Sequence, residues 1–379
     1  MNRAGEYVKN LSGDLEYKSF RPSELPVKVY IDNESELFDS LLRAHKGLAV
    51  LNGISSFVPN TDLYISMYVR KEAILSSQIE GTQCTLEDVL DPEVDKNVNS
   101  DVSDVVNYIK ASQYGIKRLE TLPLCLRFFR EVHAELLEGV RGEEKNPGEF
   151  RRSQNWIGPK NCGLKNARYI PPNVDDMNAA LDNLEKYLNS DDELDPIVKA
   201  ALIHYQFETI HPFLDGNGRV GRLLILFYLL EKQVIDKPVI YISYFLKKNQ
   251  LEYYDRMSEV RRTGNYEQWI NFFATAVARA AEDSIDSIKE LVALHEKDYA
   301  LLPEKKREKD AIHMLFTYIE SHPIIDIRKT SDALSLSYNT VSAAVRKLSE
   351  LGILKETTNS SRNRVFSYEK YLEILRKDI

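Results

Sequence analysis

The chain has 379 residues, of which 43% are hydrophobic and 28% are charged, and its formal net charge is −8. At roughly 150 residues per domain, this length predicts two or three domains. The composition is that of a globular protein rather than a disordered or low-complexity chain. The acidic excess disfavours a protein that coats nucleic acid with its whole surface.

Cysteines and apolar runs indicate the cellular setting. The three cysteines, Cys84, Cys125 and Cys162, are too sparse for a disulfide framework or a zinc site, so we expect reduced thiols in a cytoplasmic protein. The N-terminal residues lack the apolar region of a signal peptide. The longest wholly apolar run, Leu223–Leu230, is far shorter than the roughly 18 residues of a membrane span, so we expect no membrane contact.

Apolar residues recur at helical spacing through most of the chain, which predicts a mainly α-helical fold. Residues 1–30 look irregular, because Pro22 and Pro26 would break a helix. The first helix is expected at 34–51, followed by a break at 53–59. Later helices are expected at 62–77, 101–109, 124–137, 174–188, 195–209, 218–232, 247–262 and 266–301. The run Leu223–Leu230 is apolar on all sides and predicts a fully buried helix.

One long stretch, 141–172, has the glycines and prolines of a loop. Within it, Gln154–Gly158 and Ala167–Ile170 are predicted to be two short strands joined by a polar connection. A loop of this length inside a helical protein is usually functional.

The residues after Pro303 have a different pattern. A charged linker precedes predicted helices at 311–321, 330–336 and 340–351, and then strands at 353–356 and 364–368 around a polar hairpin loop. This order predicts a winged helix-turn-helix domain. The domain division expected is 1–110 for an N-terminal helical region, 111–302 for the catalytic domain and 303–379 for the winged helix.

The charge is distributed unevenly between these parts. The last 77 residues hold fourteen Lys+Arg against eleven Asp+Glu, a net of +3, which leaves −11 for the rest. A small basic face could bind DNA phosphates in a salt-dependent way. The residues expected on that face are Asn339, Thr340, Ser342, Arg346 and Lys347 in the second helix of the motif and Arg362 and Arg364 in the wing.

The segment His211-Pro-Phe-Leu-Asp-Gly-Asn-Gly-Arg-Val-Gly-Arg222 carries the chemistry, and three generic motifs overlap it. The spacing of Gly216, Gly218 and Gly221 matches a dinucleotide fingerprint, but the preceding segment is helical rather than a strand. A calcium loop starting at Asp215 would need glycine and glutamate where Val220 and Leu226 stand. His204 and His211 lack a third metal ligand in register.

The residues themselves predict a phosphate site. Two glycines and an asparagine precede an apolar helix, so backbone N–H groups point out of its N-terminus toward an anion. Arg219 and Arg222 lie three residues apart and can hold further phosphate oxygens. Asp215 would repel phosphates unless a cation such as Mg²⁺ lies between them. His211 titrates near neutrality and can serve as a general base.

This segment resembles the signature of Fic-domain proteins, H-P-F-x-[D/E]-G-N-G-R-x-x-R, at every fixed position. The resemblance implies transfer of AMP from ATP to a Ser, Thr or Tyr hydroxyl of a target protein, with release of pyrophosphate. It implies that His211 is the base, that Asp215 binds Mg²⁺, and that the 155–170 flap holds the target's extended backbone. The nucleotide-binding residues it implies are Gly216, Asn217, Gly218, Arg219, Val220, Gly221, Arg222, Tyr253 and Tyr254.

A second motif resembles the inhibitory pattern of the same family, [S/T]-x-x-x-E-[G/N]. It comprises Ser76, Glu80 and Gly81 and precedes the signature by more than a hundred residues. The resemblance implies that Glu80 pairs with Arg222 and excludes the γ-phosphate of ATP, so that activation requires the inhibitory helix to move. Self-modification and a homodimer are further expectations that the family resemblance raises.

Other functions stay open at this point. The chain could be a DNA-binding regulator whose Fic domain only senses nucleotide, although the intact His211 favours an enzyme. It could also be a Fic enzyme that removes AMP or transfers another phosphate-containing moiety, in which case Glu80 could position a hydrolytic water.

Overall fold

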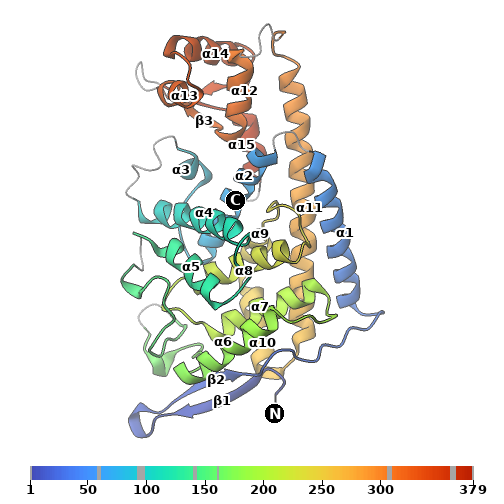
Figure 1. Cartoon of the computed structure of the whole chain (residues 1–379), viewed down its shortest axis with the longest axis vertical. Coiled ribbons are helices and arrows are strands. Elements are labelled where there is room, and N and C mark those ends of the chain that lie inside the picture. The colour runs from blue at the N-terminus through green and yellow to red at the C-terminus, as the bar shows by residue number, and fades with distance from the viewer. Residues whose placement is uncertain are drawn as a thin grey trace.

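The computed structural model describes residues 2–57, 61–91, 99–139, 143–159, 162–304, 310–358 and 364–377. In the described residues the fold is mainly helical, as predicted, and the molecule is elongated, with a two-stranded hairpin at one end and a C-terminal unit at the other (Figure 1). No helix among the described residues has the length and apolarity needed to cross a bilayer.

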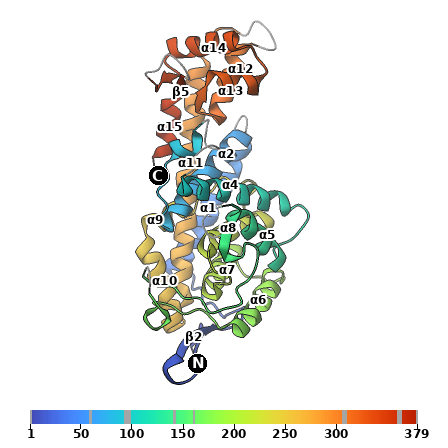
Figure 2. The same ribbon diagram turned by 90° about the vertical axis from the view of Figure 1, so that its left-hand side faces the viewer.

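Two long helices form the spine of the molecule. α1 (Glu36–Phe57) packs lengthwise against α11 (Tyr266–Tyr299), and α11 continues toward the C-terminal unit (Figure 2). The two backbones approach closely where Gly47 faces Ala281, since a Cβ atom at position 47 would lie 3.0 Å from the Cβ of Ala281. The helix α1 continues through 53–57, so the break predicted at 53–59 is wrong for those residues, while 58–60 lie outside the described residues.

The helical body around the spine agrees with most predicted ranges. Its members are α2 (Thr61–Ile79), α3 (Leu86–Leu90), α4 (Ser100–Arg118), α5 (Leu126–Leu137), α6 (Val174–Leu188), α7 (Pro196–Ile210), α8 (Asn217–Glu231), α9 (Ser243–Lys248) and α10 (Gln250–Thr263). The single helix predicted at 247–262 is divided into α9 and α10 at Asn249, whose φ of −114° departs from helical geometry. The boundary expected at residue 110 falls inside the continuous helix α4.

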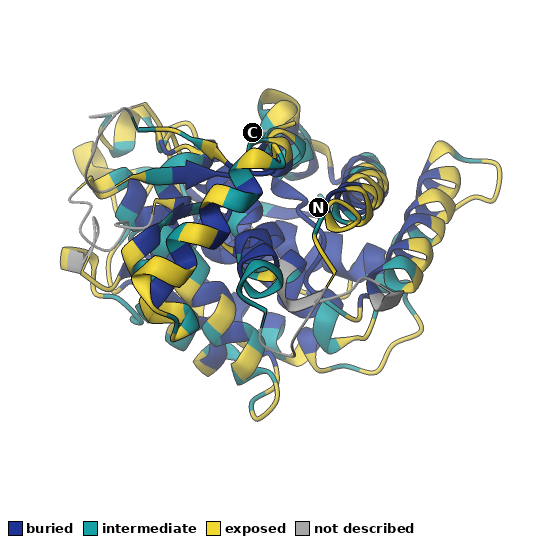
Figure 3. Ribbon diagram, turned by 90° about the horizontal axis from the view of Figure 1, so that it is seen from above, coloured by how far each residue is buried: buried dark blue, intermediate teal, exposed yellow. Residues whose placement is uncertain are grey.

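Capping residues and buried apolar faces account for where the helices α7 and α8 lie in the sequence. Asp195 caps α7 by accepting the N–H of Ile197 at 2.8 Å, and Pro196 occupies the first helical position, where no N–H donor is needed. Helix α8 is buried on all sides, as its apolar run predicts, and α7 beside it is buried from Ile197 to Ile210. Figure 3 shows the buried faces meeting in the interior of the body.

The prediction of irregular structure at 1–30 holds for 23–30, which contain neither helix nor strand, but it is wrong for the hairpin before them. β1 (Gly5–Asn10) pairs antiparallel with β2 (Tyr17–Pro22), and Pro22 stands at the strand end, where its missing N–H donor is tolerated. The N–H of Phe20 donates to Ile170 at 3.0 Å, so this hairpin lies against the 155–170 flap.

The flap contains less regular structure than predicted. Ile157 and Tyr169 form one isolated antiparallel bridge with N–O distances of 2.8 and 3.0 Å, and Leu164–Asn166 form a 3-10 turn. The two predicted strands are therefore wrong as strands, although their pairing is correct. The Gly and Pro residues of this stretch restrict pairing to a single position.

The C-terminal unit contains α12 (Ala311–Ser321), β3 (Ile324–Asp326), α13 (Ile327–Leu334), α14 (Tyr338–Glu350), β4 (Lys355–Glu356), β5 (Val365–Ser367) and α15 (Glu369–Arg376). Its strands form one antiparallel sheet in the order β3-β5-β4. The helices and strands of the predicted motif are present, while β3 and α15 are additions. The winged-helix assignment itself stays a prediction. Arg362 and the linker residues 305–309 lie outside the described residues.

Candidate active site

His211 occupies the point where α7 ends. Its backbone adopts a left-handed conformation with φ of +51°, and its N–H still donates to the carbonyl of Phe207 at 2.9 Å. A non-glycine residue in this region is uncommon and is often found at functional sites. The turn reverses the chain so that the loop 211–216 runs from α7 into the N-terminus of α8.

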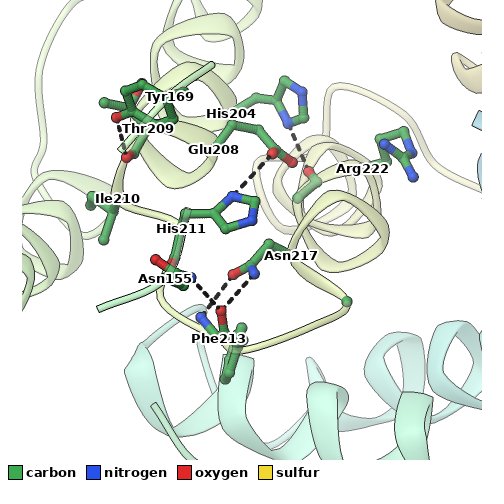
Figure 4. A network of polar contacts seen from close by, with 12 residues as sticks. Asn155, Tyr169, His204, Glu208, Thr209, Ile210, His211, Phe213, Asn217 and Arg222 are labelled. Carbon is green, nitrogen blue, oxygen red and sulfur yellow. Dashed lines mark hydrogen bonds and ion pairs between the residues drawn. The ribbon is translucent and has the colours of Figure 1, made fainter. Parts of the chain in front are cut away.

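Two side chains, one just before the flap and one at its first residue, fix this loop. The buried Arg151 donates from Nε to the carbonyl of His211 at 3.0 Å, and its Nη2 donates to the carbonyl of Pro172. Asn155 donates to the carbonyls of His211 and Phe213 at 3.2 and 2.9 Å (Figure 4). Burial lowers the pKa of Arg151 to about 10, which still leaves it charged near neutrality. A cation at this position holds the backbone beneath His211.

The imidazole of His211 faces Glu208, one turn earlier on α7 (Figure 4). Its Nδ1 lies 4.0 Å from Oε2 of Glu208 and has no hydrogen-bond partner among the described residues. Burial, with a further contribution from the positive charge of Arg151, lowers the pKa of His211 to about 4. His211 is therefore neutral at physiological pH, which is the state a general base requires.

The loop after His211 is fixed by its own polar side chains. Asn217 accepts the N–H of Phe213 and donates to its carbonyl, both at 2.8 Å, so its amide fixes the backbone of the loop. Gly216 adopts a left-handed conformation with φ of +73°, and its N–H donates to Oδ1 of Asp215 at 2.6 Å. Both Asn217 and the Gly216 N–H were expected to hold a phosphate.

Behind the loop, a buried histidine supports Phe213, the family signature's aromatic residue. The ring of His133 stacks on Phe213 at 3.8 Å between centroids, accepts the N–H of Gly148 and donates to the carbonyl of Asp215. Burial lowers the pKa of His133 to about 4. His133 is thus a neutral structural histidine, and Phe213 is the buried anchor that it holds.

The first turn of α8 carries the two arginines. The buried Arg219 lies 3.7 Å from Asp104 and 3.9 Å from Asp215, and its Nε and Nη1 have no hydrogen-bond partner among the described residues. Buried donors without partners are rare and call for a ligand or water. Arg219, Asp104 and Asp215 line a cavity of about 260 Å³ at the helix N-terminus, which we call the anion cavity.

Arg222 is held by the end of α2 through its Nε and Nη2 atoms. Its Nε donates to Oγ of Ser76 at 2.8 Å, and its Nη2 donates to the carbonyl of Ser76 at 2.9 Å and to Oε1 of Glu80 at 2.7 Å. The helix α2 ends at Ile79, and Gly81 follows with φ of +94°, a conformation that favours glycine. Ser76 and Glu80 of the second motif therefore bind Arg222, and Gly81 allows the chain to turn directly after Glu80.

The carboxylate of Glu80 lies over the first turn of α8. A Cβ atom at Gly218 would overlap Oε1 of Glu80, so glycine at this position makes room for the carboxylate. Burial raises the pKa of Glu80, but the charge and hydrogen bond of Arg222, helped by Arg219, outweigh this and lower it below its ordinary value. Glu80 is therefore an anion placed where the helix N-terminus attracts one.

A second, larger cavity of about 390 Å³ lies on the other side of Glu80, and we call it the aromatic cavity. Glu80, His211 and Gly218 line both cavities and thus stand at their junction. The rest of its lining comes from the hairpin, the flap, α7, α8 and α10, namely Tyr7, Ile157, Arg168, Tyr169, Glu208, Arg222, Tyr253, Tyr254, Met257, Ser258 and Arg261.

The two predicted tyrosines differ in exposure. Tyr254 is partly buried, while Tyr253 is buried and donates its hydroxyl to Nε2 of His204 at 2.8 Å. His204 in turn donates from Nδ1 to the carbonyl of Gly221 at 2.9 Å, so it is a neutral core residue. Neither Val220 nor Gly221 lines either cavity: Val220 is in the core, and Gly221 faces Glu208.

Mg²⁺ fits the chemistry of this corner only with ligands from a substrate. No group of three His, Cys, Asp or Glu side chains among the described residues could hold a metal ion by itself. The side chain of Asp215 is 40% exposed and lines the anion cavity, so it can supply one carboxylate ligand. Mg²⁺ commonly binds one or two carboxylates and takes its other ligands from phosphates and water.

Sequence reasoning missed the contacts by which Arg151 and Asn155 fix the loop, and it missed Glu208 as a member of the site. The first two act on backbone carbonyls across 50 to 60 residues of chain, and no spacing pattern indicates such contacts. Glu208 had a detectable signal, because residues three apart on a helix share a face, and it precedes His211 by three.

The chain is similar in sequence to known proteins. Residues 38–117 match the sequence profile of the Fic/DOC family N-terminal region, and residues 123–229 match that of the Fic/DOC family. A protein adenylyltransferase Fic of Aedes aegypti is 30% identical over 181 residues, which is 47% of this chain and 32% of the relative. The one of Drosophila mojavensis is 31% identical over 179 residues, 47% of this chain and 31% of the relative. The matched segment thus spans about a third of these relatives.

Two crystal structures share the fold. A Fic family protein from Desulfovibrio desulfuricans superposes with a TM-score of 0.56 at 16% identity, covering 90% of this chain and 97% of that one. A Fic domain containing signaling protein from Bacteroides thetaiotaomicron gives a TM-score of 0.53 at 19% identity, covering 66% of this chain and 97% of the other.

Proposed function

We propose that this chain, which contains a Fic domain at residues 123–229, is a protein adenylyltransferase that transfers AMP from ATP to a hydroxyl of a protein. The observation that carries the proposal is the place of His211. It is a neutral histidine at the junction of an anion cavity and an aromatic cavity, next to the N-terminus of α8. The relatives named as protein adenylyltransferases support the same reaction.

The two cavities suit the two parts of ATP. The aromatic cavity offers Tyr254 and Met257 to the adenine, and Arg219 with the N-terminus of α8 offers positive charge to the phosphates. The triphosphate would then cross the junction where Glu80 now lies. Mg²⁺ held by Asp215 and the phosphates would neutralise charge there.

His211 would remove the proton from the attacking hydroxyl. The hydroxyl oxygen forms a bond to the α-phosphorus of ATP, the bond from that phosphorus to the bridging oxygen breaks, and pyrophosphate leaves. The proton passes to an imidazole nitrogen of His211, and general-base catalysis of this kind contributes roughly 10²–10⁴-fold. Arg151 and Asn155 would hold His211 in place by fixing its main chain.

Glu80 would inhibit this reaction in the resting protein. Its carboxylate occupies Arg222 and the helix N-terminus, both of which a γ- or β-phosphate would need. An anion in that position repels the triphosphate and takes the Nη2 donor of Arg222 from its end. The target would be held at the flap, as an extended segment added beside the bridge between Ile157 and Tyr169. One such target could be a second copy of the chain.

The test compares labelling by α-³²P-ATP with Mg²⁺ in the wild type, in Glu80→Gly and in Glu80→Gly combined with His211→Ala. Strong labelling of protein is expected only for Glu80→Gly. The matched control is Glu138→Gly, because Glu138 also follows a helix and precedes a left-handed glycine, Gly139, but lies outside both cavities. It should label like the wild type.

Each alternative gives a different outcome. Equal labelling of wild type and Glu80→Gly would rule out inhibition by Glu80. Labelling that survives His211→Ala would rule out His211 as the base. Label from γ-³²P-ATP instead of α-³²P-ATP would indicate transfer of phosphate rather than AMP. Loss of AMP from labelled protein that depends on Glu80 would favour AMP removal.

A further inference from the structure

Two buried carboxylates on different helices face the neighbourhood of Arg222, and their surroundings differ. Glu72 on α2 accepts the N–H of Ser243 at 3.1 Å and the hydroxyl of Tyr108 at 3.4 Å. Glu208 on α7 has its Oε1 without a hydrogen-bond partner among the described residues. Its Oε2 is the atom that lies 4.0 Å from Nδ1 of His211, itself without a hydrogen bond. The buried Nδ1 of His211, without a hydrogen bond among the described residues, therefore faces Oε2 of a buried carboxylate whose other oxygen is also without one.

The helix α8 is shaped to accommodate this carboxylate. A Cβ atom at Gly221 would overlap Oε1 of Glu208, and the side chain of Phe207 lies 3.2 Å from the same point. The space between α7 and α8 is thus filled by Glu208 in place of a side chain at 221. A buried carboxylate is costly to keep unless it serves a partner.

We propose that Glu208 is a positioning residue for His211. In the active complex its carboxylate accepts a hydrogen bond from Nδ1–H of His211, which fixes the tautomer whose unprotonated Nε2 takes the proton of the acceptor hydroxyl. The proposal rests on the function proposed above, and it adds an orienting carboxylate to the base. A carboxylate has the same role toward histidine in hydrolase triads, and such contacts are often long before substrate binds.

The other charges around His211 are arranged on several elements. Arg151 before the flap and Arg261 on α10 lower the pKa of His211, while Glu80 at the end of α2 raises it. The main-chain carbonyl of Glu208 also faces the ring and raises that pKa. This carbonyl is the competing orienter, because it could hold Nδ1–H without help from the carboxylate.

Removal of the inhibitory carboxylate would strengthen the pair. Burial raises the pKa of Glu208 to about 7, Arg222 lowers it, and the negative charge of Glu80 raises it. When Glu80 moves away, the pKa of Glu208 falls and the carboxylate ionises more completely at neutral pH. An ionised Glu208 accepts the Nδ1–H hydrogen bond more strongly.

The kinetic test uses Glu208→Gln in the Glu80→Gly background, with Glu72→Gln as the matched control. Glu72 is also buried and also near Arg222, but its hydrogen bonds go to Ser243 and Tyr108. We expect Glu208→Gln to lower kcat by roughly 10–100-fold with little change in the KM for ATP. The acidic limb of the kcat profile should move to lower pH, because the carboxylate of Glu208, whose pKa burial raises to about 7, titrates above His211 and is absent from the variant. Glu72→Gln should leave that limb in place.

A second measurement reads the tautomer without any activity. In ¹⁵N-histidine-labelled Glu80→Gly protein, the imidazole shifts of His211, assigned by comparison with His211→Ala, should show protonated Nδ1 and unprotonated Nε2. In Glu208→Gln this preference should weaken.

Protonated Nε2 in the parent protein would overturn the proposal. Unchanged kcat and acidic limb in Glu208→Gln would also overturn it, and would leave the main-chain carbonyl as the orienter. If Glu80→Gly transferred no AMP, the proposed function would fail, while the tautomer would still decide this inference.

Discussion

The first turn of α8 and the helix α14 were both predicted to bind phosphates, but they present their charges differently. Arg219 and Arg222 are 7% and 3% exposed and project into closed surroundings. On α14, Asn339, Thr340 and Arg346 are exposed to solvent, while Val341, Ala344, Val345 and Leu348 on the other face are buried.

The difference in burial between these arginines affects which kind of anion each surface can bind. A buried guanidinium without full hydrogen bonding is costly and gains strongly from one well-placed phosphate. An exposed arginine loses little when free, and its contacts are screened by salt. We therefore propose the α8 site for a single nucleotide and the α14 face for an extended polyanion.

The largest expected effect comes from the buried cation under the catalytic loop. Arg151→Met leaves the carbonyl of Pro172 without its donor and the carbonyl of His211 with Asn155 alone, and each lost bond of this kind costs about 1–3 kcal/mol. We expect the free energy of unfolding in urea to fall by about 3 kcal/mol and AMP transfer to be lost. Arg152→Met is the matched control, since the neighbouring Arg152 is 89% exposed and should have no measurable effect. Equal effects of the two variants would contradict the role given to burial.

A smaller effect concerns the charge of Glu80. Glu80→Gln should raise AMP transfer at least about tenfold, because a hydrogen bond to a charged group contributes about 1.5–3 kcal/mol. The pKa of Glu80 is lowered, so its ion pair with Arg222 is fully present above the ordinary glutamate pKa and is lost only as the pH falls through the lower folded value. The ratio of the Glu80→Gln rate to the wild-type rate should therefore stay constant from pH 6 to 9. A ratio that shrinks toward pH 6 would contradict an ionised Glu80.

The smallest effect is expected on α14. If the C-terminal unit binds DNA, Arg346→Ala should weaken binding a few-fold and reduce the dependence of affinity on salt by about one phosphate contact. Gel shifts at two salt concentrations measure this, with Arg279→Ala on the body as the control. No shift of the wild type at low salt would remove DNA from the possible partners of this surface.

The sequence predicted the local parts of the site better than the parts that come together from a distance. Helical periodicity and caps gave the ranges of α6, α7 and α8 within one or two residues, because these signals lie in the helices themselves. The β1–β2 hairpin was missed, since its strands are short and its prolines suggested irregular chain.

The roles inside the signature show the same limit. The pattern predicts that Arg219, Glu80 and Asn217 belong to the site, and all three line the anion cavity, but it does not indicate that the amide of Asn217 also binds the backbone of Phe213. Val220 and Gly221 pack inside the protein and line neither cavity. Which atoms a side chain contacts depends on neighbours from distant parts of the chain, such as Arg151. The spacing of residues within one motif does not indicate those neighbours.

The length of α11 has a mechanical consequence. Its 34 residues span about 51 Å at 1.5 Å per residue. Near one end Trp269 donates to the carbonyl of Ala201 in α7 at 2.9 Å, and near the other Asp298 accepts the hydroxyl of Tyr368 at 2.9 Å. A pivot of only about five degrees at one end displaces the other by roughly 4 Å over this length. The helix α11 thus connects α7, which ends before His211, to the C-terminal unit. A small rotation of α11 at either end displaces its other end by more than the length of a hydrogen bond.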